Sequence, residues 1–216
     1  NYRAALFDMD GTLFNTKRGI VKALRMAIEE YGLEPLKESQ EEQFIGPPIQ
    51  KSIEKFYKIS EERSIECADL FRKYYREKNY VLECDLYDGM RECLETLQGK
   101  GIKLGVASLK KDDMVRRICD NYDITKYFDS IHGTDARDSL SKADIIHICM
   151  NDLKITDDSR LVMIGDTVFD ALGARKAGVP FLGVSYGFGF RSIEDLDEYP
   201  NIGLASMPSE IIELII

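Results

Sequence analysis

The sequence contains no tryptophan, only two histidines and five cysteines among 216 residues. The cysteines are scattered, odd in number and without a Cys-x-x-C pair, so these residue types do not indicate a zinc site or a cysteine nucleophile. We expect buried, reduced thiols of a cytoplasmic protein, and we interpret His132 and His147 as structural. The cysteines are Cys67, Cys84, Cys93, Cys119 and Cys149.

Long apolar runs and an excess of positive charge are also missing. The apolar runs are far too short to span a bilayer, and no signal peptide is expected. Acidic residues outnumber basic ones by 38 to 29, which gives a net charge of −9. This balance argues against binding to a nucleic acid polymer or an anionic membrane, and a small anionic ligand would require local positive charge or a metal.

The hydrophobic fraction of 44% is enough for a sizeable core. Short apolar runs typical of buried strands alternate with segments of helical spacing, many of which end at glycine. The expected strands are Ala4–Phe7, Leu104–Ala107, Ser130–Gly133, Leu161–Ile164 and Phe181–Val184. The expected helices run through Met90–Leu97, Met114–Cys119, Ile145–Leu153 and Ala171–Ala177, with Asp88 and Ser141 as N-caps of the first and third. The pattern predicts an α/β fold with a parallel-sheet, Rossmann-like core and helices on both faces.

Residues 15–83 interrupt this alternation and contain no expected strand. Helical spacing covers Ile20–Tyr31, Ile49–Tyr57 and Ile65–Tyr75. The break Gly46-Pro47-Pro48 precedes the second of these helices, and Ser60 is placed to cap the third. We therefore expect a discontinuous core of residues 1–14 and 84–216, with residues 15–83 inserted as a helical cap.

The segment Asp8-Met9-Asp10-Gly11-Thr12 follows the first expected strand. Alternation points Asp8 and Asp10 in the same direction, so one carboxylate can attack while the other transfers protons. Gly11 lets the backbone turn and approach a ligand. A lone Asp-x-Asp is also compatible with a solvated strand end, so the remaining strand ends decide between these interpretations.

Polar residues follow the other strands at the edge where parallel sheets bind ligands. Ser108 follows the second strand, Lys142 begins a helix, and Asp166 and Asp170 follow the fourth strand. Taken alone, Ser108 could be a helix cap, Lys142 a solvated lysine and Asp166 part of a turn. Together they predict a carboxylate cluster neutralised by Mg²⁺, with the serine and lysine holding phosphate oxygens.

Four segments in this order resemble the haloacid dehalogenase superfamily of phosphohydrolases, and the resemblance covers nearly the whole chain. They are Asp8–Phe14, Val106-Ala107-Ser108, Lys142-Ala143-Asp144 and Gly165–Asp170. The resemblance implies that Asp8 is a nucleophile that forms an aspartyl-phosphate. It also implies that Asp10 protonates the leaving oxygen and then activates water.

The resemblance further assigns the remaining strand-end residues. Thr12, Ser108 and Lys142 would bind the phosphoryl group. Mg²⁺ would be held by Asp8, the backbone carbonyl of Asp10 and Asp166. Asp170 would be either a further ligand or a partner of the ligands.

The position of the insert resembles the helical-cap type. Within that type, Ile45–Pro48 and Tyr186–Gly189 resemble the phosphoglycolate phosphatase branch. Gly46, Pro47 and Lys51 would then face the leaving group, although an interhelical turn is the other interpretation of this stretch. Gln50-Lys51 stands where relatives often carry arginine, and a lysine cannot make a bidentate carboxylate contact. Lys111 stands where proline is common in relatives.

The sequence therefore predicts a Mg²⁺-dependent phosphatase that acts on a small phosphorylated metabolite, as a monomer or a homodimer. Phosphoglycolate, nucleoside monophosphates, pyrophosphate and sugar phosphates are the candidate substrates. A phosphotransferase or sugar phosphomutase of the same fold is the first alternative. A phosphate-binding module without catalytic activity is the second.

Overall fold

A computed structural model describes residues 2–216. The chain divides into two compact units, one formed by the stretch that ends at Phe14 together with Leu86–Ile216, the other by Asn15–Asp85. The helical unit therefore ends two residues later than the boundary expected from the sequence. Two short strands, β2 (Phe14–Asn15) and β3 (Asp85–Leu86), pair at the passage from one unit to the other. Asn15 thus belongs to a strand, contrary to the all-helical expectation from residue 15.

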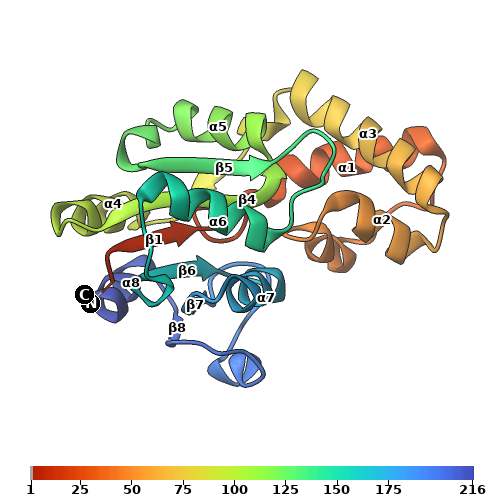
Figure 1. The fold of residues 1–216 in the computed structure, drawn as a ribbon. Helices are drawn as coiled ribbons and strands as arrows, with labels where there is room; N and C mark the ends of the chain where they lie inside the picture. Colours follow the sequence, from red (N-terminus) through yellow and green to blue (C-terminus); the bar gives the residue numbers. More distant parts are fainter. Residues whose placement is uncertain (1) are drawn as a thin grey trace. The chain divides into compact units, whose positions relative to one another are not determined.

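The first unit is built on a six-stranded sheet of order β5-β4-β1-β6-β7-β8, in which every neighbouring pair is parallel (Figure 1). The expected α/β class with a parallel sheet is confirmed. All five expected strands are present, and β8 is an additional short strand. The strands are β1 (Ala4–Phe7), β4 (Lys103–Lys111), β5 (Ser130–Thr134), β6 (Leu161–Gly165), β7 (Phe181–Val184) and β8 (Leu204–Ala205).

Helices cover both faces of this sheet because successive residues of the central strands point in opposite directions and are buried on either side. Ala4 and Leu6 of β1 pack in one core with α6 and α7, whereas Ala5 and Phe7 are fully buried toward the other face. The helices are α4 (Met90–Gly99), α5 (Asp112–Asn121), α6 (Lys142–Leu153), α7 (Val168–Ala177) and α8 (Pro208–Ile215). Short 3-10 turns lie at Thr125–Tyr127, Asp158–Arg160 and Ile193–Leu196.

Several element boundaries differ from the sequence expectations. Strand β4 continues past Ala107 through Ser108 to Lys111, and its pairing with β5 shifts between Ala107 and Lys111. The N-cap of α4 is Gly89 rather than Asp88, because the chain enters this helix with a φ of +79° that glycine adopts without strain. Helix α8 was not expected from the sequence.

The second unit is helical. Its longer helices are α1 (Lys17–Tyr31), α2 (Ile49–Tyr57) and α3 (Glu61–Glu77), and 3-10 turns lie at Glu38–Gln40, Glu42–Phe44 and Tyr80–Leu82. Helix α1 ends at Gly32 in the left-handed conformation, and Ser60 accepts a hydrogen bond from the Arg63 amide at the start of α3, both as expected. Helix α3 packs against both α1 and α2.

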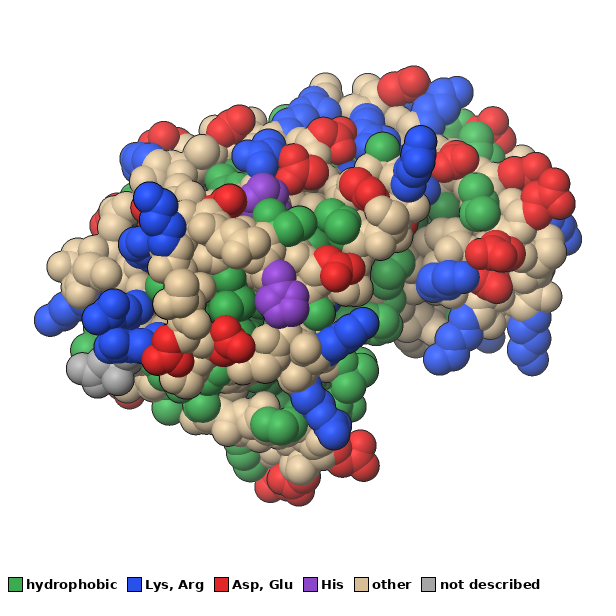
Figure 2. Space-filling model, in the orientation of Figure 1, with side chains coloured by type: hydrophobic (Ala, Val, Ile, Leu, Met, Phe, Trp, Pro, Cys, Tyr) green, Lys and Arg blue, Asp and Glu red, His purple; other side chains and the backbone are tan. Residues whose placement is uncertain are grey.

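The burial of the cysteines and the charged side chains on the surface agree with what the composition predicts. All five cysteines are buried, and none of them forms a disulfide within the described residues. Within residues 2–216, no helix is both long and apolar enough to cross a membrane. On the face seen in Figure 2, acidic and basic side chains are interspersed.

Ser141 fixes the start of α6 and therefore the position of Lys142, the first residue of that helix. Its hydroxyl accepts a hydrogen bond from the Asp144 amide, and the Asp144 carboxylate accepts one from the Ser141 amide. We expect Ser141→Ala to lower the free energy of unfolding by about 1 kcal/mol, measured by urea denaturation. Ser141→Asp keeps a capping oxygen and should retain most of the stability. An alanine variant as stable as the parent would contradict this role.

Candidate active site

Asp8 and Lys142 form a buried ion pair at the carboxyl ends of the strands. Asp8 follows β1, where its amide donates to the Ile164 carbonyl of the neighbouring strand at 2.9 Å. The ammonium Nζ of Lys142 lies 2.8 Å from Asp8 Oδ1 and 2.8 Å from Asp170 Oδ1. It also donates to the Ala107 carbonyl at 2.5 Å. The lysine therefore bridges two carboxylates and is no solvated surface residue, because its side chain is only 5% exposed.

Asp170 uses both of its carboxylate oxygens within the protein. Oδ1 faces Lys142, and Oδ2 accepts hydrogen bonds from the amides of Asp166 and Thr167, each at 3.1 Å. The Thr167 hydroxyl also donates to Oδ2 at 3.2 Å. Asp170 thus caps the first turn of α7 while it holds the lysine in place.

Asp166 follows β6 and is fully buried. The Phe188 amide donates to its Oδ2 at 2.7 Å, and the Thr12 hydroxyl donates to its Oδ1 at 3.3 Å. Burial raises the pKa of Asp166 well above its ordinary value, and the nearby carboxylates of Asp170 and Asp8 add to the rise. The hydrogen bonds from Thr12 and Phe188 thus do not offset the cost of an ionised Asp166 carboxylate at this depth.

Asp8, Asp166 and Asp170 can share one metal ion. Each offers a carboxylate oxygen, and these oxygens all lie within 4.8 Å of one another. Burial raises the pKa of Asp8 from its ordinary 3.8 to about 7, Asp170 adds to the rise, and Lys142 opposes it. A hard divalent cation would relieve this repulsion, and carboxylate oxygens are the ligands that Mg²⁺ prefers. The residues present therefore fit the expected magnesium ion.

Asp10 is paired with a residue that the sequence analysis did not identify. Lys110 Nζ lies 2.6 Å from Asp10 Oδ1, with the two side chains only 6% and 11% exposed. The signal in the sequence was the pair Lys110-Lys111, separated from Ser108 by Leu109. Because the expected strand ended at Ala107, Lys110 was assigned no place in the sheet.

Two glycine-containing loops meet over Asp166. Gly11 has a φ of +84°, and a Cβ built there would lie 2.1 Å from Asp166 Oδ2. A Cβ on Gly187 would lie 2.2 Å from the Gly11 carbonyl oxygen and 2.4 Å from Asp166 Oδ2. The Tyr186 hydroxyl donates to the Thr12 carbonyl at 3.0 Å. Only residues without a side chain allow the two loops to approach this carboxylate so closely.

Ser108 and Lys111 lie near the end of β4. Ser108 is 1% exposed, and its hydroxyl oxygen accepts a hydrogen bond from the Lys110 amide at 3.1 Å. Lys111 Nζ donates to the carbonyls of Asp135 and Ala136 at 3.1 and 2.8 Å. The lysine that stands in place of the common proline therefore tethers the loop after β5.

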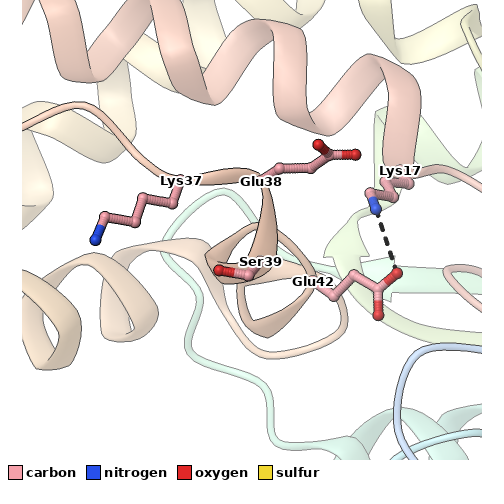
Figure 3. Close-up of a pocket in the computed structure, with 5 residues that line it drawn as sticks. All are labelled: Lys17, Lys37, Glu38, Ser39 and Glu42. Atoms are coloured by element: carbon pink, nitrogen blue, oxygen red, sulfur yellow. Dashed lines mark hydrogen bonds and ion pairs between the residues drawn. The ribbon is translucent and has the colours of Figure 1, made fainter.

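Gly46, Pro47 and Lys51 belong to the helical unit. Lys51 is exposed and pairs with Glu54 at 3.2 Å and with Glu61 at 3.5 Å. The same unit has a hollow of about 590 Å³, shown in Figure 3 and lined by Lys17, Lys37, Glu38, Ser39 and Glu42. Lys17 pairs with Glu42 at 3.3 Å, and Lys37 points away from that pair. These charges do not converge on one point, so we assign the hollow no chemistry.

The fold and the carboxylate cluster agree with the comparison to protein families. Residues 5–184 match the model of the haloacid dehalogenase-like hydrolases. The chain belongs to this family of enzymes, as the resemblance of its four motif segments indicated.

The similar proteins include a nucleotidase, several phosphatases and also a tyrosine-protein kinase of Mycobacterium tuberculosis. A 5'-nucleotidase of Pseudomonas aeruginosa is 31% identical over 188 residues, which is 87% of this chain and 85% of that protein. A phosphoglycolate phosphatase of Aquifex aeolicus is 28% identical over 213 residues, or 99% and 96% of the two chains. The crystal structure of a predicted phosphatase from Clostridium acetobutylicum has a TM-score of 0.91 and 32% identity, and the match covers 99% of this chain and 98% of that one.

The raised pKa of Asp8 makes the stability of the metal-free protein depend on pH. The folded state keeps a proton on this carboxyl up to about pH 7, whereas an unfolded chain loses it near 3.8. The free energy of unfolding should therefore fall as the pH rises between these values. Urea denaturation in chelator at pH 5 and pH 8 measures this slope. Asp8→Asn should make this slope shallower, with the raised pKa of Asp166 accounting for the rest, and an unchanged slope in that variant would contradict the assignment.

The approach of Gly187 to Asp166 predicts a steric penalty. Gly187→Ala should lower the free energy of unfolding by about 2 kcal/mol, measured by urea denaturation, because backbone atoms cannot move aside cheaply. Gly99→Ala is the matched control, since a Cβ there meets no other atom within 4 Å. We expect that variant to be as stable as the parent or slightly more so. Equal stability of the two alanine variants would refute the argument.

Proposed function

We propose that this hydrolase is a Mg²⁺-dependent phosphatase that acts on a small phosphomonoester through an aspartyl-phosphate on Asp8. The observation that carries the proposal is the buried Asp8, paired with Lys142 at 2.8 Å and within 4.8 Å of two further carboxylates. A site that only bound phosphate would need positively charged side chains, and a carboxylate at its centre would repel the ligand. The names of the nucleotidase and of the phosphoglycolate phosphatases among the similar proteins support the same reaction class.

In the proposed reaction, an oxygen of Asp8 attacks phosphorus and the bond to the leaving oxygen breaks. Asp10 gives its proton to that oxygen, so the alcohol departs neutral. Water then attacks the phosphorus of the acyl phosphate, and Asp10 takes the proton of this water. Inorganic phosphate leaves, and Asp8 is regenerated as a carboxylate.

The charges of the site support a divalent cation. Asp8, Asp10, Asp166 and Asp170 contribute four carboxylates, whereas Lys110 and Lys142 contribute two ammonium groups. When bound, Mg²⁺ supplies the missing positive charge and polarises a phosphoryl oxygen. Asp8, Asp166 and the backbone carbonyl of Asp10 are the proposed ligands. Because Asp170 is ion-paired with Lys142 and caps the first turn of α7, we assign it the task of holding Lys142.

The remaining assignments follow the same logic. Lys142 and the hydroxyl of Ser108 are proposed to bind phosphoryl oxygens, and Thr12 to support the loop that carries Asp8 and Asp10. We further propose that the helical unit is a cap whose residues Gly46, Pro47 and Lys51 contribute to substrate choice. The five thiols, none of which forms a disulfide, favour a reducing, cytoplasmic location.

A panel of phosphorylated metabolites tests the reaction class. We expect inorganic phosphate to be released from 5'-nucleotides, phosphoglycolate, pyrophosphate or sugar phosphates in the presence of Mg²⁺, and the release to stop in chelator. Colorimetric phosphate detection measures this result. An isomerised sugar phosphate without release of phosphate would instead favour the mutase alternative.

Substitution of the two motif carboxylates tests their roles. Asp8→Asn should lower kcat by about a thousandfold or more, because the amide cannot form the acyl phosphate. Asp10→Asn should also lose steady-state turnover while it still binds substrate, because no group remains to transfer protons. The exposed Asp197→Asn is the matched control and should turn over normally. Near-normal turnover in Asp10→Asn would refute the acid–base assignment.

A further inference from the structure

Lys110 is held in place from both sides along the chain. Its own amide donates to the Ser108 hydroxyl at 3.1 Å. The next residue, Lys111, is tethered to the loop after β5 by hydrogen bonds to two carbonyls. The shift in pairing between β4 and β5 falls in the same stretch, and such irregularities re-aim side chains next to active sites. The ammonium of Lys110 is thus directed at Asp10 by a fixed backbone.

Asp10 would otherwise be drawn toward the metal. It lies two residues from Asp8, and it is near enough to raise the pKa values of both Asp8 and Asp166. Yet among the described residues, the acidic side chains that can share an ion are Asp8, Asp166 and Asp170. The carboxylate of Asp10 is turned to Lys110 instead, at 2.6 Å.

We propose that Lys110 is a positioning residue that keeps the Asp10 carboxylate out of the ligand set of the metal and so leaves it free for proton transfer. The inference rests on the proposed function, because it takes the metal and the role of Asp10 from there. A carboxylate bound to the metal cannot at the same time lie within hydrogen-bond reach of the leaving oxygen or of the attacking water. The ammonium of Lys110, 2.6 Å from Asp10 Oδ1, engages this carboxylate and so competes with the metal for it.

Magnesium binding to the purified, metal-free protein tests the proposal by calorimetry. Lys110→Met removes the ammonium and keeps the length of the side chain. We expect this variant to bind Mg²⁺ about tenfold more tightly, because a further carboxylate joins the ligands, while its kcat falls. Lys110→Arg should restore both the affinity and kcat toward parent values. Should Lys110→Met fail to fold, Lys110→Gln keeps a hydrogen-bond donor without the charge and should shift the affinity in the same direction.

The double variant separates ligation from simple loss of positive charge. With Asp10→Asn in the background, Lys110→Met should leave the Mg²⁺ affinity unchanged, because no carboxylate remains to join the metal. Tighter binding that persists in this background would overturn the proposal, as would an unchanged affinity in the single variant.

The outcomes also distinguish this proposal from the proposed function. A parent protein that neither binds Mg²⁺ nor releases phosphate overturns the function itself. A parent that does both, with an unaltered affinity in Lys110→Met, overturns only the role of Lys110.

Discussion

The arrangement of side chains at the carboxyl ends of the strands depends on the balance of buried charge. Four carboxylates converge where the strands end, and two buried lysines reach them from β4 and α6. An unpaired charge at such depth would cost several kcal/mol, so each lysine is as necessary to the fold as to the chemistry. The cap of α6, the first turn of α7 and the glycine loops all serve to bring these charges to fixed distances. The proposed divalent cation would complete the balance.

Much of the fold could be predicted from the sequence because buried parallel strands appear in it as short, uninterrupted apolar runs. Ala4–Phe7 and Leu161–Ile164 are uninterrupted apolar runs, and glycine marks the ends of α1 and α7. The two residues of β8 are too few to form a pattern. The entry into α4 was misjudged because an aspartate is a familiar N-cap, whereas the backbone there requires the positive φ of Gly89.

The candidate site could be predicted in part for a related reason. Asp8, Lys142 and Asp166 lie at the ends of recognisable elements, so the topology alone brings them together. Lys110 could not be identified in this way, because β4 runs on past its apolar stretch and sequence periodicity does not indicate which partner a long side chain reaches. The contact of Gly187 with Asp166 joins two loops that are distant in the sequence, and a single glycine does not indicate such a contact.

The pairing of β2 with β3 has a consequence for how such a chain can diversify. The two ends of the helical insert leave and re-enter the sheet-bearing unit as neighbouring strands, joined by backbone hydrogen bonds. For the core, the whole insert is one long loop closed by this strand pair, and loop length has only a weak effect on the free energy of closing it. Evolution can therefore lengthen, rebuild or exchange the insert while the buried charges stay where they are. Because substrate choice is proposed to lie in the insert and the reaction in the core, the two properties could change independently.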